Sequence, residues 1–314
     1  MPANMISWHC FPAELRLIVL EILLQDGCSV AALLATVSRE WQTTIERYTF
    51  SRIKLTSSRV AHFGSMVHRN RSLVRYIWFC LELQEYNCTE CESHDPDLLY
   101  QSNADNGLIT AAFQDLFSTL SVWEPGGSLL LDISVYSPSD SEHWFKYLTF
   151  EPDVASDMCG RDQDAEQSML VKASDHHHGW VAGRRNVIHP PAAIEKIFGE
   201  IMGGALFGSE EEEGQWWQQL PLVPAVTSVL LRQQTRRRWK PAALTHMFAR
   251  LPGLPEIHYE PWREWLGILQ HWTDECKCHC ASSTFSATSC GSVILLAAND
   301  LLIFLVLCSF TTAF

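Results

Sequence analysis

Apolar residues recur with helical spacing over the first fifty residues of the chain. Five of them stand at positions i, i+3, i+4, i+7 and i+8 and share one face of a predicted helix that begins near Pro12: Leu15, Ile18, Val19, Ile22 and Leu23. Gly27 interrupts this pattern, and Ser29 and Ser38 are then placed to cap a second helix over 30–37 and a third over 39–50. The pattern therefore predicts three short helices.

This three-helix segment carries more apolar residues than it can bury by itself. Leu17, Leu20 and Leu24 lie beside the stripe on the first helix, and Leu33 and Val37 add apolar surface to the second. Because three helices of this length enclose only a small core, we expect a partner or a following domain to cover the rest.

After residue 51 the pattern changes to short apolar runs that alternate with helical segments. Strands are predicted at 52–55, 72–83, 128–136, 226–232 and 254–262. Helices are predicted at 57–70, with Ser57 or Ser58 as its cap, at 107–123, with Leu108, Ala111, Ala112 and Phe113 through Leu120 inside, and at 240–251. The alternation favours an irregular leucine-rich-repeat-like α/β array, although no regular LxxLxL text is present and the polar stretch 151–190 is expected to form a long loop. The fold class is therefore expected to be α+β.

The C-terminal segment 293–310 is predominantly apolar, with Asn299 and Asp300 near its middle. A central Asp costs about 2.5–3.5 kcal/mol in a membrane-spanning helix, and the length barely meets the requirement for a span. Three interpretations stay open: a tail anchor, a buried final helix, and non-native text from a misread gene structure. We favour the last and place the tail anchor second.

Composition, net charge and cysteine count limit the kinds of function that the chain can have. The chain has 314 residues, 47% of them hydrophobic, which is enough for a sizeable core. A formal net charge of −13 argues against a dedicated nucleic-acid binder, since phosphate contacts need a surplus of Lys and Arg. Eleven cysteines with irregular spacing and no N-terminal signal peptide indicate reduced thiols inside the cell.

The amino-acid sequence of the N-terminal segment resembles an F-box. Phe11-Pro12-x-Glu14-Leu15, then Ile22-Leu23-Leu24, then Leu33-x-x-x-Val37-Ser38-Arg39-x-Trp41 follow the order and spacing of the pattern LPxEL…IL…L…VSRxW, with Phe11 where the family usually has Leu. Later segments, including RNRSLVRYIWFCLELQEYNCTECE, HWFKYLTFEPD and the text from 220 to 265, are similar to a large set of filamentous-fungal F-box proteins. The likeness ends near residue 265.

The resemblance implies a division of the chain and a role for each part. Residues 8–50 would form the F-box, 51–265 a degenerate repeat region that binds a target, and 266–314 an atypical tail. An F-box docks on the Skp-type adaptor of a cullin-RING ubiquitin ligase, so the implied partners are that adaptor and a protein substrate. The implied contact or supporting positions are Phe11, Pro12, Leu15, Ile18, Ile22, Leu23, Leu33 and Val37. Trp41 is expected to hold the third helix in place.

Cysteine and histidine residues supply candidate metal ligands. Cys88 and Cys91, with His94 three residues further on, have the spacing of half a zinc site, which needs a second pair of ligands. The CKCHC text at 276–280 is a candidate for that pair, but its single-residue spacing is unusual, and the favoured expectation is no bound metal and no cofactor. The run His176-His177-His178 is interpreted as a solvated surface tract.

Two function classes remain. The chain contains no GxSxG, Walker, dinucleotide-binding or HExxH motif, so we expect a non-catalytic substrate receptor of a ubiquitin ligase in the cytoplasm or nucleus. The alternative is a metal-stabilised or tail-anchored scaffold without a ligase role. Two charge runs are interpreted as solvated surface: Glu210 to Glu213, and Arg236 to Arg238, for which a nuclear import signal is the other interpretation. Trp216 and Trp217 are expected to lie in the core.

Overall fold

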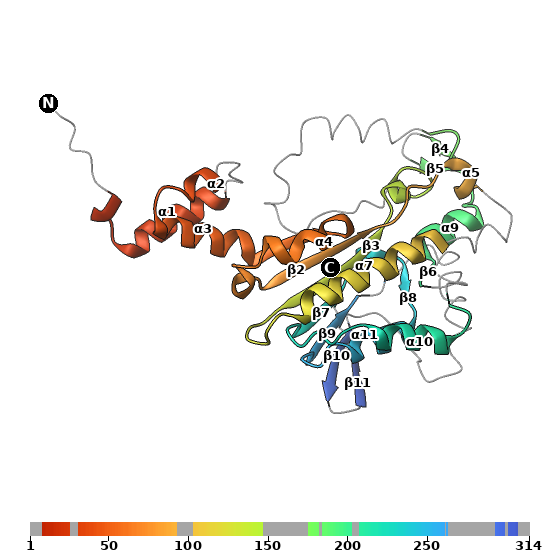
Figure 1. Cartoon of the computed structure of the whole chain (residues 1–314). Helices are drawn as coiled ribbons and strands as arrows, with labels where there is room; N and C mark the ends of the chain where they lie inside the picture. The colour runs from red at the N-terminus through yellow and green to blue at the C-terminus, as the bar shows by residue number, and fades with distance from the viewer. Residues whose placement is uncertain are drawn as a thin grey trace.

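The fold combines a helical N-terminal unit with a mixed α/β body (Figure 1). In this computed structural model the described residues are 8–25, 31–92, 103–146, 175–181, 184–202, 207–260, 262, 293–298 and 301–306. The chain leaves the helical unit through the helix α3 and enters the first strand of the body without an intervening loop.

Three helices form the N-terminal unit, as the apolar pattern predicts. They are α1 (Ala13–Gln25), α2 (Ala31–Leu34) and α3 (Arg39–Ser51), preceded by the 3-10 turn η1 (Trp8–Cys10). Ser38 caps α3, because its hydroxyl accepts a hydrogen bond from the backbone N–H of Trp41 at 3.3 Å. Ser29, the expected cap of the second helix, lies outside the described residues.

A seven-stranded sheet is the centre of the body. Its strands lie in chain order: β1 (Arg52–Thr56), β2 (Tyr76–Glu82), β3 (Leu130–Tyr136), β7 (Ser228–Leu231), β9 (Glu256–Tyr259), β10 (Val293–Ala298) and β11 (Leu301–Val306). The first five strands are parallel, and β10 and β11 add an antiparallel edge. Two small ladders lie outside this sheet: β4 (Trp180–Val181) with β5 (Arg184–Arg185), and β6 (Glu200–Ile201) with β8 (Arg238–Trp239).

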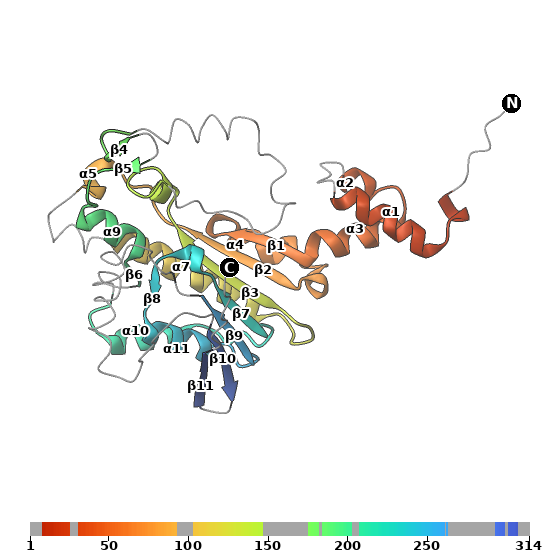
Figure 2. The same cartoon turned by 180° about the vertical axis from the view of Figure 1, so that it is seen from behind.

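Helices connect the parallel strands, and most of them pack on one face of the sheet. They are α4 (Ser57–Met66), α5 (Cys88–Cys91), α7 (Asn103–Ser121), α9 (Pro191–Phe198), α10 (Glu210–Gln219) and α11 (Pro241–Ala249), with the 3-10 turns η2 (Arg71–Leu73), η3 (Pro138–Ser141) and η5 (Gln233–Thr235). The helix α7 lies in front of the strands in Figure 1 and behind them in the reverse view of Figure 2. Parallel strands need crossover connections of this kind.

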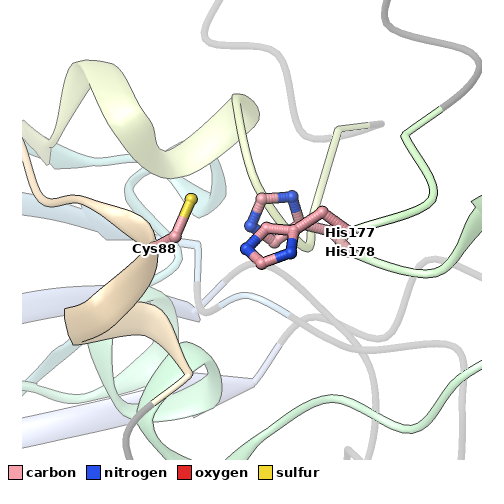
Figure 3. A group of neighbouring side chains, drawn as sticks. All are labelled: Cys88, His177 and His178. Atoms are coloured by element: carbon pink, nitrogen blue, oxygen red, sulfur yellow. The ribbon is translucent and has the colours of Figure 1, made fainter.

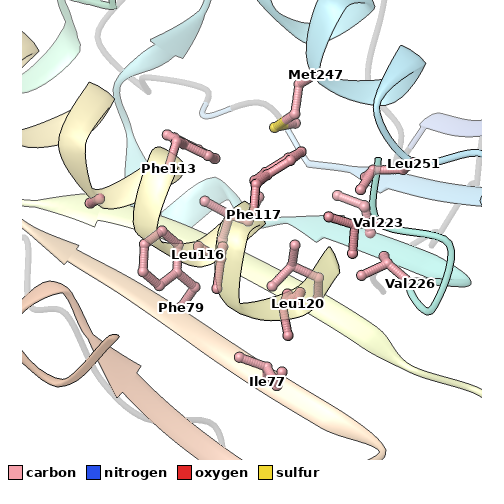
Figure 4. Close-up of a cluster of buried hydrophobic side chains, with 14 of the residues drawn as sticks. Ile77, Phe79, Phe113, Leu116, Phe117, Leu120, Val223, Val226, Met247 and Leu251 are labelled. Carbon is pink, nitrogen blue, oxygen red and sulfur yellow. The ribbon is translucent and has the colours of Figure 1, made fainter. Parts of the chain in front are cut away.

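The main core lies between this helical layer and the sheet (Figure 4). In register across four strands, Ile77, Leu131, Val229 and Ile257 are all fully buried. Phe113 of α7 is also fully buried, and its ring lies against the rings of three aromatic residues from other elements: Phe79, Trp217 and Trp239. Aromatic side chains from β2, α10 and β8 therefore pack against α7.

Two local predictions for the helices are wrong. Leu108 and Ala111 of α7 are exposed, whereas Ala112 and Phe113 are buried as predicted, because only one face of the helix packs toward the sheet. The N-cap residue of α4 is Thr56 and not Ser57 or Ser58, because the helix begins directly after β1. The side chain of Thr56 makes no capping hydrogen bond.

Both charge runs are less solvated than the sequence suggested. Glu213 is buried and its carboxylate lies 2.8 Å from Nζ of Lys240, while the earlier residues of that run form the exposed first turn of α10. Arg237 makes a paired contact with the Asp140 carboxylate at 2.6 and 3.0 Å. A run of like charge shows only neighbouring residues, whereas the partners of these charged side chains come from distant segments of the chain.

The apolar C-terminal segment forms strands and not a helix. Residues 293–298 and 301–306 make the hairpin of β10 and β11, which pairs with β9. The interpretation of this segment as a buried final helix is therefore wrong for these residues, and the tail anchor and the misread gene structure stay predictions. Within the described ranges, every helix is too short or too polar to cross a membrane.

Candidate functional site

The N-terminal unit presents an apolar surface along α1 and the end of α2. Six of the positions implied by the F-box resemblance are exposed, at 41–69% of their full area: Phe11, Leu15, Ile18, Ile22, Leu33 and Val37. We call these six residues the apolar face. Pro12 is also exposed, and Leu23 is half-buried.

The geometry of α1 explains this exposure. Leu20 and Leu24 lie on the opposite side of the helix from the stripe and are buried, as is Ile45 of α3. These three are the buried side chains of the unit among its described residues, so its interior is small. The remaining apolar side chains of α1 have no room inside.

The orientation of α1 against α3 is fixed at one end of the unit. Nη1 of Arg16 lies 3.1 Å from the carboxylate of Glu40, which also accepts a hydrogen bond from the Trp8 indole at 3.3 Å. The rings of Trp8 and Trp41 are 5.1 Å apart between centroids. Trp41 therefore contributes to holding α3 in place, which agrees with the role expected from its position in the motif.

A second candidate site lies where the chain leaves the carboxyl ends of β2 and β3. Cys88 and Cys91 belong to α5, which follows β2, and His143 follows β3 through the turn η3. His178 belongs to the short segment before β4. Because parallel strands end at the same edge of a sheet, segments distant in sequence meet here.

Ligand atoms of these residues and of His177 form two groups of three, within each of which all atoms lie within 4.8 Å of one another: Cys91, His143 and His178, and Cys88, His177 and His178. Sγ of Cys88 lies 3.7 Å from Nδ1 of His143, and Sγ of Cys91 lies 3.8 Å from Nε2 of His178. The two facing imidazole nitrogens, Nδ1 of His143 and Nε2 of His178, are 3.3 Å apart. His177 is close to Cys88 and His178, as Figure 3 shows, but its side chain is 59% exposed and pairs with Glu92.

The outer nitrogens of both histidines have hydrogen-bond acceptors. Nε2 of His143 donates to the backbone carbonyl of Tyr86 at 3.0 Å, and Nδ1 of His178 donates to the Asp175 carboxylate at 2.6 Å. Lys146 also contacts this carboxylate, at 2.8 Å. Carbonyl and carboxylate oxygens only accept hydrogen bonds, so each ring carries its proton on the outer nitrogen and directs a lone pair inward.

Burial sets the protonation of the cluster. Loss of water around His178 lowers the pKa of its imidazole and favours the neutral ring, and burial raises the pKa of the Cys91 thiol to about 12. Burial alone would raise the pKa of Asp175, but the hydrogen bonds from Lys146 and His178 outweigh this effect and hold the pKa well below its usual range. The Asp175 carboxylate is therefore charged, whereas the His178 imidazole and the Cys91 thiol are neutral.

Sequence reasoning found half of this cluster. Cys88 and Cys91 were candidates because of their spacing, whereas His94 and the cysteines at 276–280 lie outside the described residues. His178 was assigned to a solvated tract, which is wrong, since its side chain is 5% exposed. The sequence around His143, between a capped turn and Trp144, gives no local signal for a ligand.

Comparison of the chain with models of protein families, with curated proteins and with solved structures gives no match. The geometry of the two sites is therefore the basis for functional inference.

Proposed function

We propose that the protein is a substrate receptor of a cullin-RING ubiquitin ligase, which docks on a Skp-type adaptor through the N-terminal unit. The observation that supports this most strongly is the exposure of the apolar face, whose residues are those of the F-box-like text. Monomeric proteins rarely leave a contiguous apolar patch uncovered, and such a patch usually marks an interaction surface.

The architecture of the unit suits a docking role. Its three helices bury Leu20, Leu24 and Ile45 among themselves, and the direct passage from α3 into β1 leaves α1 and α2 beyond the end of the sheet (Figure 1). A partner can therefore cover the apolar face without displacing any part of the body that packs on the sheet.

The body would hold the protein to be ubiquitinated. Parallel strands in chain order with helices on one face are consistent with an irregular leucine-rich-repeat-like array, as the sequence suggested. The opposite face carries Arg52 stacked on Tyr76 and Lys54 stacked on Trp78, at 4.3 and 4.6 Å from the ring centroids. The positively charged side chains of Arg52 and Lys54 are exposed on this face and stack on aromatic rings. We propose this face as the surface that binds the target.

In this role the chain acts by proximity and not by bond chemistry. Holding a target beside a charged ubiquitin-conjugating enzyme raises its effective concentration, and the chemical step belongs to other subunits. The proposal therefore requires an adaptor, a cullin and a target, and no cofactor for the transfer reaction.

Binding to a purified Skp-type adaptor tests the proposal. The full-length chain should bind the adaptor, and a double variant, Leu15→Asp with Ile22→Asp, should weaken binding at least about 30-fold, because two buried interface anchors would be replaced by charges. Leu222→Asp is the matched control, since Leu222 and Leu15 are both 48% exposed. It should leave the affinity unchanged.

Two results would contradict the proposal: no measurable binding by the unmodified chain, or equal affinity of the double variant and the unmodified chain. The first result would leave the alternative of a metal-stabilised or tail-anchored scaffold without a ligase role. Far-UV circular dichroism of each variant checks that the helices are retained.

A further inference from the structure

The side-chain cluster at the carboxyl edge of β2 and β3 has the composition and geometry of a structural metal centre. We propose that Cys91, His143 and His178, whose ligand atoms lie within 4.8 Å of one another, bind one Zn²⁺ ion, and that Cys88, 3.7 Å from His143, completes a tetrahedral Cys₂His₂ site that ties together the loops after β2 and β3 and the segment before β4. This inference does not depend on the proposed ligase role.

The distances between the ligand atoms fit a tetrahedral ion. With Zn–S bonds of about 2.3 Å and Zn–N bonds of about 2.0–2.1 Å, a tetrahedron places sulfur and nitrogen ligands about 3.6 Å apart and two nitrogen ligands about 3.3 Å apart. The two sulfur–nitrogen separations in the cluster are 3.7 and 3.8 Å, and the nitrogen–nitrogen separation is 3.3 Å.

The tautomers of the histidines favour a cation between them. Because His143 donates to the carbonyl of Tyr86 and His178 donates to Asp175, their facing nitrogens both present lone pairs at 3.3 Å. Two lone pairs at this distance repel each other unless a positive charge lies between them. Thiol protons of Cys88 and Cys91 are the donors available nearby, and a thiol is a weak donor.

Zinc binding replaces these two thiol protons. One Zn²⁺ ion forms two Zn–S and two Zn–N bonds, the two S–H bonds break, and both protons pass to solvent, so two thiolates neutralise the ion without any change of oxidation state. Sulfur and imidazole ligands in a tetrahedral arrangement select Zn²⁺ over Mg²⁺ or Ca²⁺, which prefer six or more oxygen ligands.

The surroundings of the site have the second layer of contacts that zinc ligands usually require. The carboxylate of Asp175 holds His178 in its orientation, and this carboxylate is itself held by Lys146. On the other side, α5 begins with a capping box between Asn87 and Glu90, which fixes the turn that carries both cysteines. These contacts position the ligands before the ion arrives.

Zinc would stabilise a part of the body that has only a small apolar interior. The cluster adjoins a second core, separate from the main one, whose buried residues are Tyr86, Cys91, Trp144, Phe145, Ala193, Ile194, Ile197 and Phe198. A core of this size gives limited stability, and structural zinc supplies the free energy that apolar burial lacks in such regions.

Metal analysis of the full-length chain tests the site. The purified chain should contain one equivalent of zinc, lose it to a chelator and regain one equivalent when Zn²⁺ alone is added. Replacement by Co²⁺ should give the visible absorption of a tetrahedral ion and a sulfur-to-metal charge-transfer band. Less than half an equivalent of zinc after reloading would overturn the proposal, whatever the variants show.

Variants then test the ligand set. Cys88→Ser and His143→Gln should each lose zinc at a chelator concentration that leaves the unmodified chain loaded, and Asp175→Asn should keep one equivalent with an affinity about 10–100-fold lower. His177→Asn is the matched control and should retain both stoichiometry and affinity, since His177 is exposed and pairs with Glu92.

Loss of zinc from His177→Asn to the same extent as from His143→Gln would overturn this ligand set, as would full retention by Cys88→Ser. Adaptor binding, measured on the same samples, is expected to be unaffected by zinc removal if the N-terminal unit keeps its helices. Failure of the zinc proposal is therefore distinguishable from failure of the ligase proposal.

Discussion

The helical unit and the α/β body use apolar side chains in opposite ways. In the body, apolar residues at alternate strand positions are fully buried beneath α7, α10 and α11, as Ile77, Leu131 and Val229 are. In the helical unit, most of the apolar residues of α1 are exposed, and only Leu20 and Leu24 are buried. A closed core supports stability, whereas an open apolar surface has value only if a partner covers it.

The same difference appears in the ion pairs of the two regions. Asp140 and Arg237 are both almost fully buried in the body, and the contact with Asp140 outweighs burial and raises the pKa of Arg237. In the helical unit, the side chains of Arg16 and Glu40 are 20% and 37% exposed. The body therefore depends on its polar contacts in a way that the helical unit does not.

The largest expected effect is a difference in the free energy of unfolding between two phenylalanine-to-alanine variants, one in each region. Phe113→Ala should reduce the free energy of unfolding by about 3–5 kcal/mol, because it leaves a cavity among packed aromatic rings. Phe11→Ala should change it by less than about 0.5 kcal/mol, since Phe11 is 41% exposed. Urea unfolding followed by circular dichroism measures both, and equal costs would remove the contrast between the regions.

Removal of one partner from each ion pair should give a similar separation. Asp140→Ala leaves the Arg237 guanidinium buried without its carboxylate and should cost about 3–5 kcal/mol. Glu40→Ala breaks a partly exposed pair and should cost about 0–1 kcal/mol. Thermal and urea unfolding of both variants check this, and a cost for Glu40→Ala as large as that for Asp140→Ala would show that the helical unit is a closed structure.

The smallest effect should be the same in both regions. Ser38 caps α3 and Ser209 caps α10, with hydroxyl oxygens 3.3 and 3.2 Å from the backbone nitrogens that they satisfy. Because a cap acts locally, Ser38→Ala and Ser209→Ala should each cost about 1 kcal/mol in the same unfolding experiment. A much larger loss for one of them would mean that the cap also carries tertiary contacts.

Local patterns along the chain were sufficient for most of the elements. Helical spacing predicted α1 and α3, β-branched and aromatic runs predicted β2 and β3, and Pro241 marked the start of α11. These features depend on residues within a few positions of one another, so periodicity and capping chemistry reveal them. The mixed α/β character of the body follows from the same alternation.

Local patterns failed where the deciding contact comes from a distant segment. Lys240 is the partner of buried Glu213, and Asp140 is the partner of Arg237, so neither charge run is simply a solvated surface. The apolar run at 293–310 leaves a buried final helix open as one of three interpretations, whereas pairing with β9 makes strands of its described residues. An apolar run without periodicity is compatible with both structures.

By itself, the sequence determined helices such as α1 and α3, strands such as β2 and β3, and the apolar residues of α1, because these properties are set by neighbours along the chain. Only the tertiary structure decided which of those apolar residues remain exposed and which cysteines and histidines meet. His143 and His178 are far from Cys88 in sequence. His143 meets the cysteines because the parallel strands β2 and β3 end at one edge of the sheet, and the segment before β4 brings His178 to the same place. A ligand set assembled in this way has no signature in sequence spacing.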